Sequence, residues 1–274
     1  MSYRTVEAGR GVGWLTDAVA LVLRNPAVFL VMALIVAVIG AVPVLGQLTL
    51  LVIGPALWGG FAWGLREQDA GREATVGHLF AAFTQPGKIG PMLLLCLPSI
   101  AAIVVFVVLG FLLVGGALLT MGITTTSPGS GMANAFSGGA LLGVLLMLLV
   151  GLAVYGLIIF AIPRVMLEDA EPIAAMKDSL AASLANIVPL LIYGLVTGVI
   201  FGVLLVLLFW IPILGWLAWG LAFHAVNAAA LYVAWKDVYG AAPDDSVPLS
   251  PLPPPPPPRR TTATFRALSG SSAS

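Results

Sequence analysis

The fold is decided by the stretch Pro163–Pro189, PRVMLEDAEPIAAMKDSLAASLANIVP, the longest charged interval between two strongly apolar runs. Its apolar side chains recur at steps of three or four residues, which places them on one face of a helix. The pattern follows Glu171-Pro172, and proline suits the first turn of a helix, where its missing N–H costs nothing. We therefore predict an amphipathic helix that lies in the membrane interface between two spans. Its apolar face comprises Ile173, Met176, Leu180, Leu184 and Ile187.

Two earlier stretches repeat this pattern less strongly. The first begins near Trp14 and ends at Asn25-Pro26, and the second ends at Gln85-Pro86. In both, apolar residues recur with helical spacing next to charged residues, so each predicts a further interfacial helix. Trp14 carries the kind of ring that settles at the level of the lipid headgroups. The apolar faces are Trp14, Ala18, Leu21 and Val22 in the first stretch and Val76, Leu79, Phe80 and Phe83 in the second.

The composition is that of a membrane protein. Hydrophobic residues make up 60% of the 274 residues and charged residues 9%, and the mean hydropathy is +1.07. A soluble domain carries about 25% charged residues. The sequence predicts an all-α integral membrane protein whose six transmembrane helices form three hairpins, each preceded by a cytoplasmic interfacial amphipathic helix. A bend is expected near Pro98. The predicted spans are Ala27–Leu45, Leu48–Leu65, Met92–Leu113, Ala140–Ile162, Val188–Trp210 and Leu214–Trp235.

The charges predict which loops share one side of the membrane. With six spans, one set of loops and both termini hold all 12 basic and all 12 acidic residues. The alternate loops, around Gln47, residues 122–139 and Ile211–Ile213, hold none. Short loops rich in Lys and Arg stay in the cytoplasm, so both termini are expected there.

The C-terminal part has a different composition from the rest. We predict two regions, a six-helix transmembrane domain over residues 1–240 and a disordered, proline-rich cytoplasmic tail over residues 241–274. Pro253–Pro258 is an unbroken proline run that favours an extended polyproline II conformation. A solvated, semi-rigid tail is the preferred interpretation, and a recognition ligand is the alternative.

Several stretches resemble an uncharacterised family of bacterial six-span inner-membrane proteins, which is distantly similar to the membrane domains of some glycerophosphodiester phosphodiesterases. These are AGRGVGWLTDAVALVLRNP, IGPALWGGFAWGLREQDAG, Phe160–Pro189 and YVAWKDVYG. The likeness covers about Arg4–Gly240. It implies a location in the bacterial inner membrane and brings no activity with it, because no phosphodiesterase domain is present.

Two groups of residues are candidates for a site. His224 and Asn227 lie near the middle of the sixth predicted span, three residues apart, and polar side chains in hydrocarbon need partners. Tyr155, Tyr193 and Thr197 are the expected partners. Either this group holds helices together or it forms the polar part of a ligand-binding cavity. Gly194, Gly198 and Gly202, spaced by four residues, predict a helix-packing face.

The remaining sequence signals argue against catalysis and ion transport. Neither the HExxH motif of metalloproteases nor the GxSxG motif of α/β-hydrolases occurs, and no acidic residue lies in a predicted span. We expect no enzymatic activity, cofactor, metal or nucleic-acid partner. The expected partner is the lipid bilayer, together with a second copy of the chain or another membrane protein. The predicted function is membrane organisation or lipid interaction; a permease for an apolar or amphipathic small molecule is the alternative.

Overall fold

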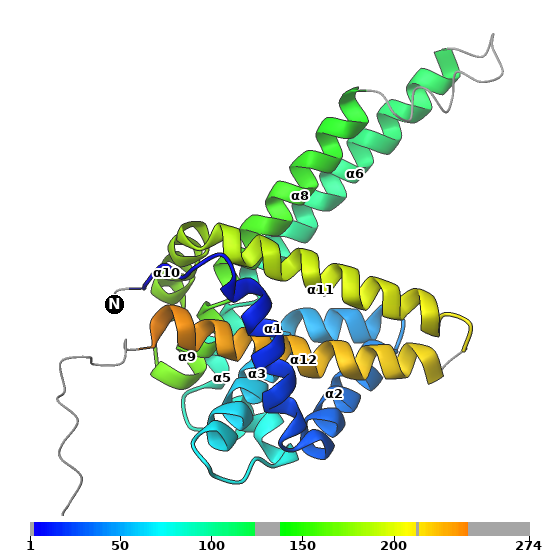
Figure 1. The fold of residues 1–274 in the computed structure, drawn as a ribbon. Coiled ribbons are helices and arrows are strands. Elements are labelled where there is room, and N and C mark those ends of the chain that lie inside the picture. Colours follow the sequence, from blue (N-terminus) through cyan, green and yellow to red (C-terminus); the bar gives the residue numbers. More distant parts are fainter. Residues whose placement is uncertain (1–2, 124–137, 212–213, 241–274) are drawn as a thin grey trace, which may run out of the picture. The chain divides into compact units, whose positions relative to one another are not determined.

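A computed structural model describes residues 3–123, 138–211 and 214–240. Contacts divide the chain into Met1–Gly240 and Ala241–Ser274, and the predicted tail lies outside the described residues. Most of the uncharged loop predicted over residues 122–139 lies outside them too. Every regular element that the structure describes is helical (Figure 1). The elements are α1 (Arg10–Leu23), α2 (Pro26–Gly40), α3 (Leu45–Asp69), the 3-10 helix η1 (Val76–Phe80), α4 (Ala81–Thr84), α5 (Ile89–Leu94), α6 (Leu97–Ile123), α8 (Gly138–Ile158), α9 (Ala161–Glu168), α10 (Pro172–Ala185), α11 (Ile187–Leu208) and α12 (Leu214–Tyr239).

The length and hydropathy of its helices identify this chain as a multi-pass membrane protein. Five segments are long and apolar enough to cross a membrane, or up to six if the bent pair α1 and α2 counts as one span. The difference from the six predicted spans lies in α2. This helix has 15 residues and ends at Gly40, whereas the predicted span reaches Leu45 and a full crossing needs about 20 residues.

Prolines mark the helix boundaries that the sequence predicts. The bend between α1 and α2 is 106°, at Asn25-Pro26. Asn25 has a non-helical backbone (φ −146°) and Pro26 occupies the first turn of α2, so the chain changes direction there as predicted. The third span is interrupted between α5 and α6, at Leu95 and Cys96, just before Pro98. Proline cannot donate the backbone hydrogen bond that would continue the helix.

Consecutive long helices pack as pairs, α2 with α3, α6 with α8 and α11 with α12. The pair α6 and α8 (the hairpin) runs side by side in Figure 1. The two helices are antiparallel. Gly110 of α6 lies near Met147 of α8, whereas Phe106, earlier in α6, lies near Gly151, later in α8. Among the described residues, the hairpin contacts the rest of the protein mainly through α8, which packs against α9 and α10.

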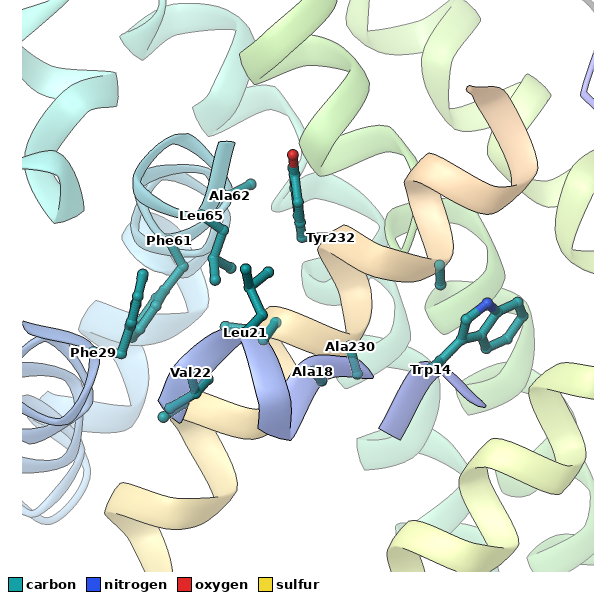
Figure 2. Close-up of a cluster of buried hydrophobic side chains, with 14 of the residues drawn as sticks. Trp14, Ala18, Leu21, Val22, Phe29, Phe61, Ala62, Leu65, Ala230 and Tyr232 are labelled. Atoms are coloured by element: carbon teal, nitrogen blue, oxygen red, sulfur yellow. The ribbon is translucent and has the colours of Figure 1, made fainter. Parts of the chain in front are cut away.

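The main buried core surrounds α12, which packs against α1, α2, α3 and α11 (this group is the bundle). Small side chains on α12 let these helices approach closely. Figure 2 shows aromatic and aliphatic side chains from α1, α2 and α3 converging on it. Trp14 and Phe29 are fully buried there. The buried alanines of α12 are Ala225, Ala228, Ala229, Ala230 and Ala234.

Trp14 is buried in the protein, and its position at headgroup level stays a prediction. Its side chain is 0% exposed, and its indole Nε1 donates a 2.8 Å hydrogen bond to Asp237. The predicted face of α1 is otherwise correct, since Ala18, Leu21 and Val22 are buried with Trp14. The face packs against α11 and α12, so α1 is integrated into the protein core.

Helix α10 presents two different faces. The face toward the protein carries small residues, including Ala175, Ser179 and Ala182, which are fully buried. Two large aliphatic residues of the predicted apolar face, Ile173 and Leu184, are more than half exposed. The predicted apolar face is therefore divided, because Met176 is buried in the protein and Leu180 is half-buried, whereas Ile173 and Leu184 point away from it.

Candidate functional site

A cavity of about 510 Å³ lies between the hairpin and the bundle. Residues of α1, α3, α6, α8, α9, α11 and α12 line it. Within the described part of the chain, the hairpin helices are not closely packed against α3 or α12, which form the opposite wall. The space therefore separates two groups of helices. Much of its wall is apolar and includes Leu51, Pro55 and Trp58 from α3, Val154 and Ile158 from α8 and Leu231 from α12.

Hydroxyl and amide groups interrupt this apolar lining. On the bundle side, the Tyr193 hydroxyl donates a 2.6 Å hydrogen bond to Asn227 Oδ1. Asn227 Nδ2 in turn donates to the main-chain oxygen of Phe223 at 2.8 Å. On the hairpin side, Tyr155 and Ser99 line the cavity. Asn227 thus reaches one of the partners expected for it.

His224 lies one turn before Asn227 in α12 and has a different environment. Its ring meets Trp58 edge-on, with centroids 6.1 Å apart, and also packs against Phe223. Its Nδ1 is buried and has no hydrogen-bond partner among the described residues. The same holds for the Thr197 hydroxyl, although Thr197 was an expected partner. A direct role for His224 or Asn227 in binding stays a prediction.

The glycine ladder of α11 faces away from the protein. An added Cβ on Gly194, Gly198 or Gly202 would meet no atom of the described chain within 4 Å. The ladder is not used for packing between the described helices. A packing role, which its spacing predicts, concerns contacts with another molecule and stays a prediction.

Ion pairs gather the charged segments at one end of the bundle. Arg10 of α1 pairs with Asp237 of α12 at 2.6 Å. Lys88, before α5, pairs with Asp169, after α9, at 2.5 Å. Ion pairs also join Lys236 of α12 to Asp69 at the end of α3. Because these residues come from the loops and helix ends that were predicted to share one side, the structure agrees with that grouping.

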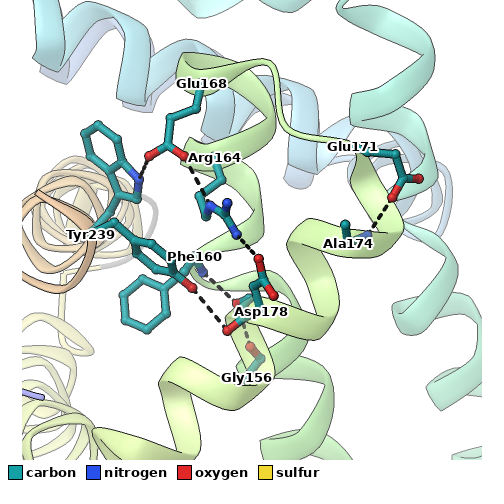
Figure 3. Close-up of polar contacts among 10 residues, drawn as sticks. Gly156, Phe160, Arg164, Glu168, Glu171, Ala174, Asp178 and Tyr239 are labelled. Carbon is teal, nitrogen blue, oxygen red and sulfur yellow. Dashed lines mark hydrogen bonds and ion pairs between the residues drawn. The ribbon is translucent and has the colours of Figure 1, made fainter. Parts of the chain in front are cut away.

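A buried arginine organises the junction of α9, α10 and α12 (Figure 3). Arg164 is 4% exposed, and it binds Glu168 at 3.1 Å and Asp178 at 2.7 Å. Trp235 of α12 donates to the other oxygen of Glu168 at 3.0 Å, and the Tyr239 ring lies 4.8 Å from the guanidinium carbon. Glu168 and Arg164 therefore take part in a network that joins three helices.

A serine hydroxyl interrupts the backbone between α8 and α9. In a continuous helix, the Phe160 N–H would donate to the Gly156 oxygen. Instead, Ser179 of α10 accepts from Phe160 N at 3.1 Å and donates to the Gly156 oxygen at 2.7 Å. An inserted side chain is an established cause of helix breaks. The sequence offers one signal for this contact, the spacing of Ser179 and Ser183 by one turn on the small-residue face.

The described residues contain no group of side chains suited to bind a metal ion. Over residues 3–123, 138–211 and 214–240, no three His, Cys, Asp or Glu side chains are grouped so that they could hold a metal ion. The charged groups described above form ion pairs or cap helices; Glu171, for example, accepts from the main-chain N–H groups of Ile173 and Ala174 at the start of α10. What the arrangement offers chemically is an apolar volume with a few neutral hydrogen-bonding groups.

Comparisons with protein-family models, with curated proteins and with solved structures found no match for this chain.

Proposed function

We propose that this multi-pass membrane protein binds a lipid or lipid-like amphiphile in the cavity between the hairpin and the bundle, and that it is not an enzyme. The observation that supports the proposal is the mostly apolar cavity of about 510 Å³ between helices that are long and apolar enough to cross a membrane. Ligand sites in proteins are typically concave, mostly apolar and about 300–1,000 Å³ in volume. A cavity of this kind, reached through hydrocarbon, suits a molecule that is already dissolved in the bilayer.

The charges of the cavity lining support a lipid over an ion. Of the described residues that line it, none is Asp, Glu, Lys or Arg. Ion-coupled carriers generally place such residues within the membrane, where they are costly and functional. The permease alternative uses the same cavity and differs only in requiring that the ligand cross to the other side.

The location and orientation of the protein belong to the same proposal. We place it in a bacterial inner membrane, as the family resemblance implies, with both termini in the cytoplasm. The orientation is supported by the restriction of all basic residues to one set of loops, together with the ion pairs that gather many of them at one end.

The test is to fill the cavity. In Val154→Trp, a large ring replaces a side chain of α8 that lines the cavity. The matched control is Val144→Trp, on the same helix, where the valine is 61% exposed and is not among the lining residues. Each protein is extracted gently in native lipid and examined by native mass spectrometry. We expect the wild type and Val144→Trp to retain a bound lipid and Val154→Trp to lose it.

Two outcomes would contradict the proposal. The wild type could emerge without bound lipid, or both variants could retain the same lipids in the same amounts as the wild type. Circular dichroism and size-exclusion chromatography of each variant show whether it has folded, so that loss of lipid is separated from loss of structure.

A further inference from the structure

We propose that the cavity selects an uncharged lipid that carries a hydrogen-bond acceptor, such as the carbonyl of a glyceride ester or of a quinone ring. This inference rests on the proposed function and narrows its ligand class. It follows from two properties of the lining residues, their lack of charge and the hydrogen-bond donors that they leave unused.

The lack of charge limits the part of a ligand that can enter. A phosphate or ammonium group inside the cavity would find no opposite charge on any described lining residue. Burying an unpaired charge is far more costly than burying a neutral polar group that finds a partner. Trp14 also lines the cavity, but its N–H is already donated to Asp237 and is not free for a ligand. A charged headgroup is therefore disfavoured there.

The hydrogen bonds of Asn227 fix the orientation of its amide. A main-chain oxygen can only accept, so the group that faces Phe223 at 2.8 Å is the NH2 group. Oδ1 then accepts the proton of the Tyr193 hydroxyl at 2.6 Å. One of the two Nδ2 hydrogens is used for Phe223, and no described residue accepts the second. Asn227 therefore has a donor left for a ligand.

Tyr155 supplies a second donor, from the opposite wall. Its hydroxyl makes no hydrogen bond to any described residue, and its side chain is 48% exposed although it lines the cavity. Two unused donors on facing helix groups favour a ligand that accepts hydrogen bonds. A carbonyl oxygen, with two lone pairs, is the simplest neutral acceptor, and a lipid that carries it keeps its chains in the apolar part of the cavity.

The experiment compares three probes in nanodiscs that contain the full-length protein. Dioleoylglycerol supplies ester carbonyls without charge, a ubiquinone supplies ring carbonyls without charge, and dioleoylphosphatidylglycerol supplies the same chains as the first with a charged headgroup. Native mass spectrometry measures which probe the protein retains. We expect one or both neutral probes to be retained in preference to the phospholipid, and the arm that succeeds identifies glyceride or quinone as the source of the carbonyl.

The decisive variant is Tyr155→Phe. It removes a hydroxyl that makes no hydrogen bond to any described residue, so folding should be unchanged. We expect it to weaken retention of the neutral probe by roughly 2- to 12-fold, the equivalent of one hydrogen bond. The control is Thr197→Val, which removes a buried hydroxyl of α11 that is not among the lining residues, and retention should not change. Asn227→Leu should weaken retention like Tyr155→Phe, with its folding checked separately because Tyr193 loses a partner.

The outcomes separate the two proposals. If the phospholipid is retained as well as dioleoylglycerol, and Tyr155→Phe has no effect, the cavity holds acyl chains only; the inference is then wrong and the proposed function stands. If the wild type retains none of the probes and Val154→Trp behaves like the wild type, the proposed function is wrong as well.

Discussion

The hairpin and the bundle differ in where their hydrophobic side chains point. Along α8, large residues such as Val144 and Leu148 are exposed, whereas along α12 the buried surface is largely alanine. In the most apolar window of the span that contains α8, 28% of the residues are buried, against 50% in α3. Yet α8 belongs to the more hydrophobic of these two spans.

The comparison shows that hydrophobicity and burial have separate meanings in this protein. In a bilayer the lipid tails are as apolar as leucine, so exposing leucine to them costs little. Close packing between helices needs small residues and complementary shapes instead. In the bundle, α3 and α12 are built by such packing, whereas the hairpin helices, like α11, leave most of their large side chains exposed. The cavity lies where the two kinds of helix face each other.

The largest expected effect tests the close packing of α3, a bundle helix, against η1. Gly60 of α3 has no room for a side chain, because an added Cβ would clash with the main-chain carbonyl of Leu79. Gly60→Ala should lower the free energy of unfolding by about 2–3 kcal/mol, measured by chemical unfolding in detergent. Gly110→Ala, in the hairpin, is the control, since its nearest neighbour would be Met147 at 4.0 Å. Equal effects of the two substitutions would remove the distinction between the regions.

An intermediate effect is expected where the base of the hairpin joins the bundle. Arg164→Ala removes the 4% exposed guanidinium that binds Glu168 and Asp178. Removing one partner of a fully buried ion pair lowers the free energy of unfolding by about 3–5 kcal/mol. Because both carboxylates are partly exposed, we expect a loss of about 2 kcal/mol in the same measurement.

The control for this substitution is Arg72→Ala. The Arg72 side chain is 57% exposed and pairs with Glu67, and an exposed ion pair is screened by solvent, so its removal should leave the free energy of unfolding close to that of the wild type. If the two arginines proved equally dispensable, the network in Figure 3 would not hold α9, α10 and α12 together.

The smallest effect is expected on the lipid-facing surface of the hairpin. Leu148 is 57% exposed, and lipid replaces its contacts in both the folded and the unfolded state within the membrane. Leu148→Ala should therefore change the free energy of unfolding by less than about 0.5 kcal/mol. Leu57→Ala, at a position that is 1% exposed in α3, shows that the measurement can detect the loss of a leucine. A large effect at Leu148 would mean that another protein covers this surface.

The sequence predicts most of the helix boundaries because they depend on local features. Pro26 and Pro98 mark breaks, and the restriction of charge to alternate loops gives the grouping of helix ends. The first span is the exception. Its apolar run continues to Leu45, but the backbone turns after Gly40, and Val44 has a positive φ of 63°. Hydropathy measures how long a segment stays apolar and does not report where its backbone turns.

The candidate site is less predictable, because its parts come from distant segments. Asn227 and its partner Tyr193 were predicted from the cost of burying polar groups in hydrocarbon. The cavity itself depends on the spacing between helices that are far apart in sequence, for which no local pattern exists. The glycine ladder illustrates the same limit, since the spacing of Gly194, Gly198 and Gly202 places them on one face and does not say what that face contacts.

The Ser179 hydroxyl makes the direction of α8 and the position of α10 mechanically dependent on each other. It completes the hydrogen bonds of both the Gly156 oxygen and the Phe160 N–H, which end and restart the helix. If α10 moved away across the membrane surface, these two backbone groups would lose their partner in an apolar environment. The junction between α8 and α9 therefore depends on α10 for its backbone hydrogen bonds, and it lies beside Tyr155 in the cavity wall.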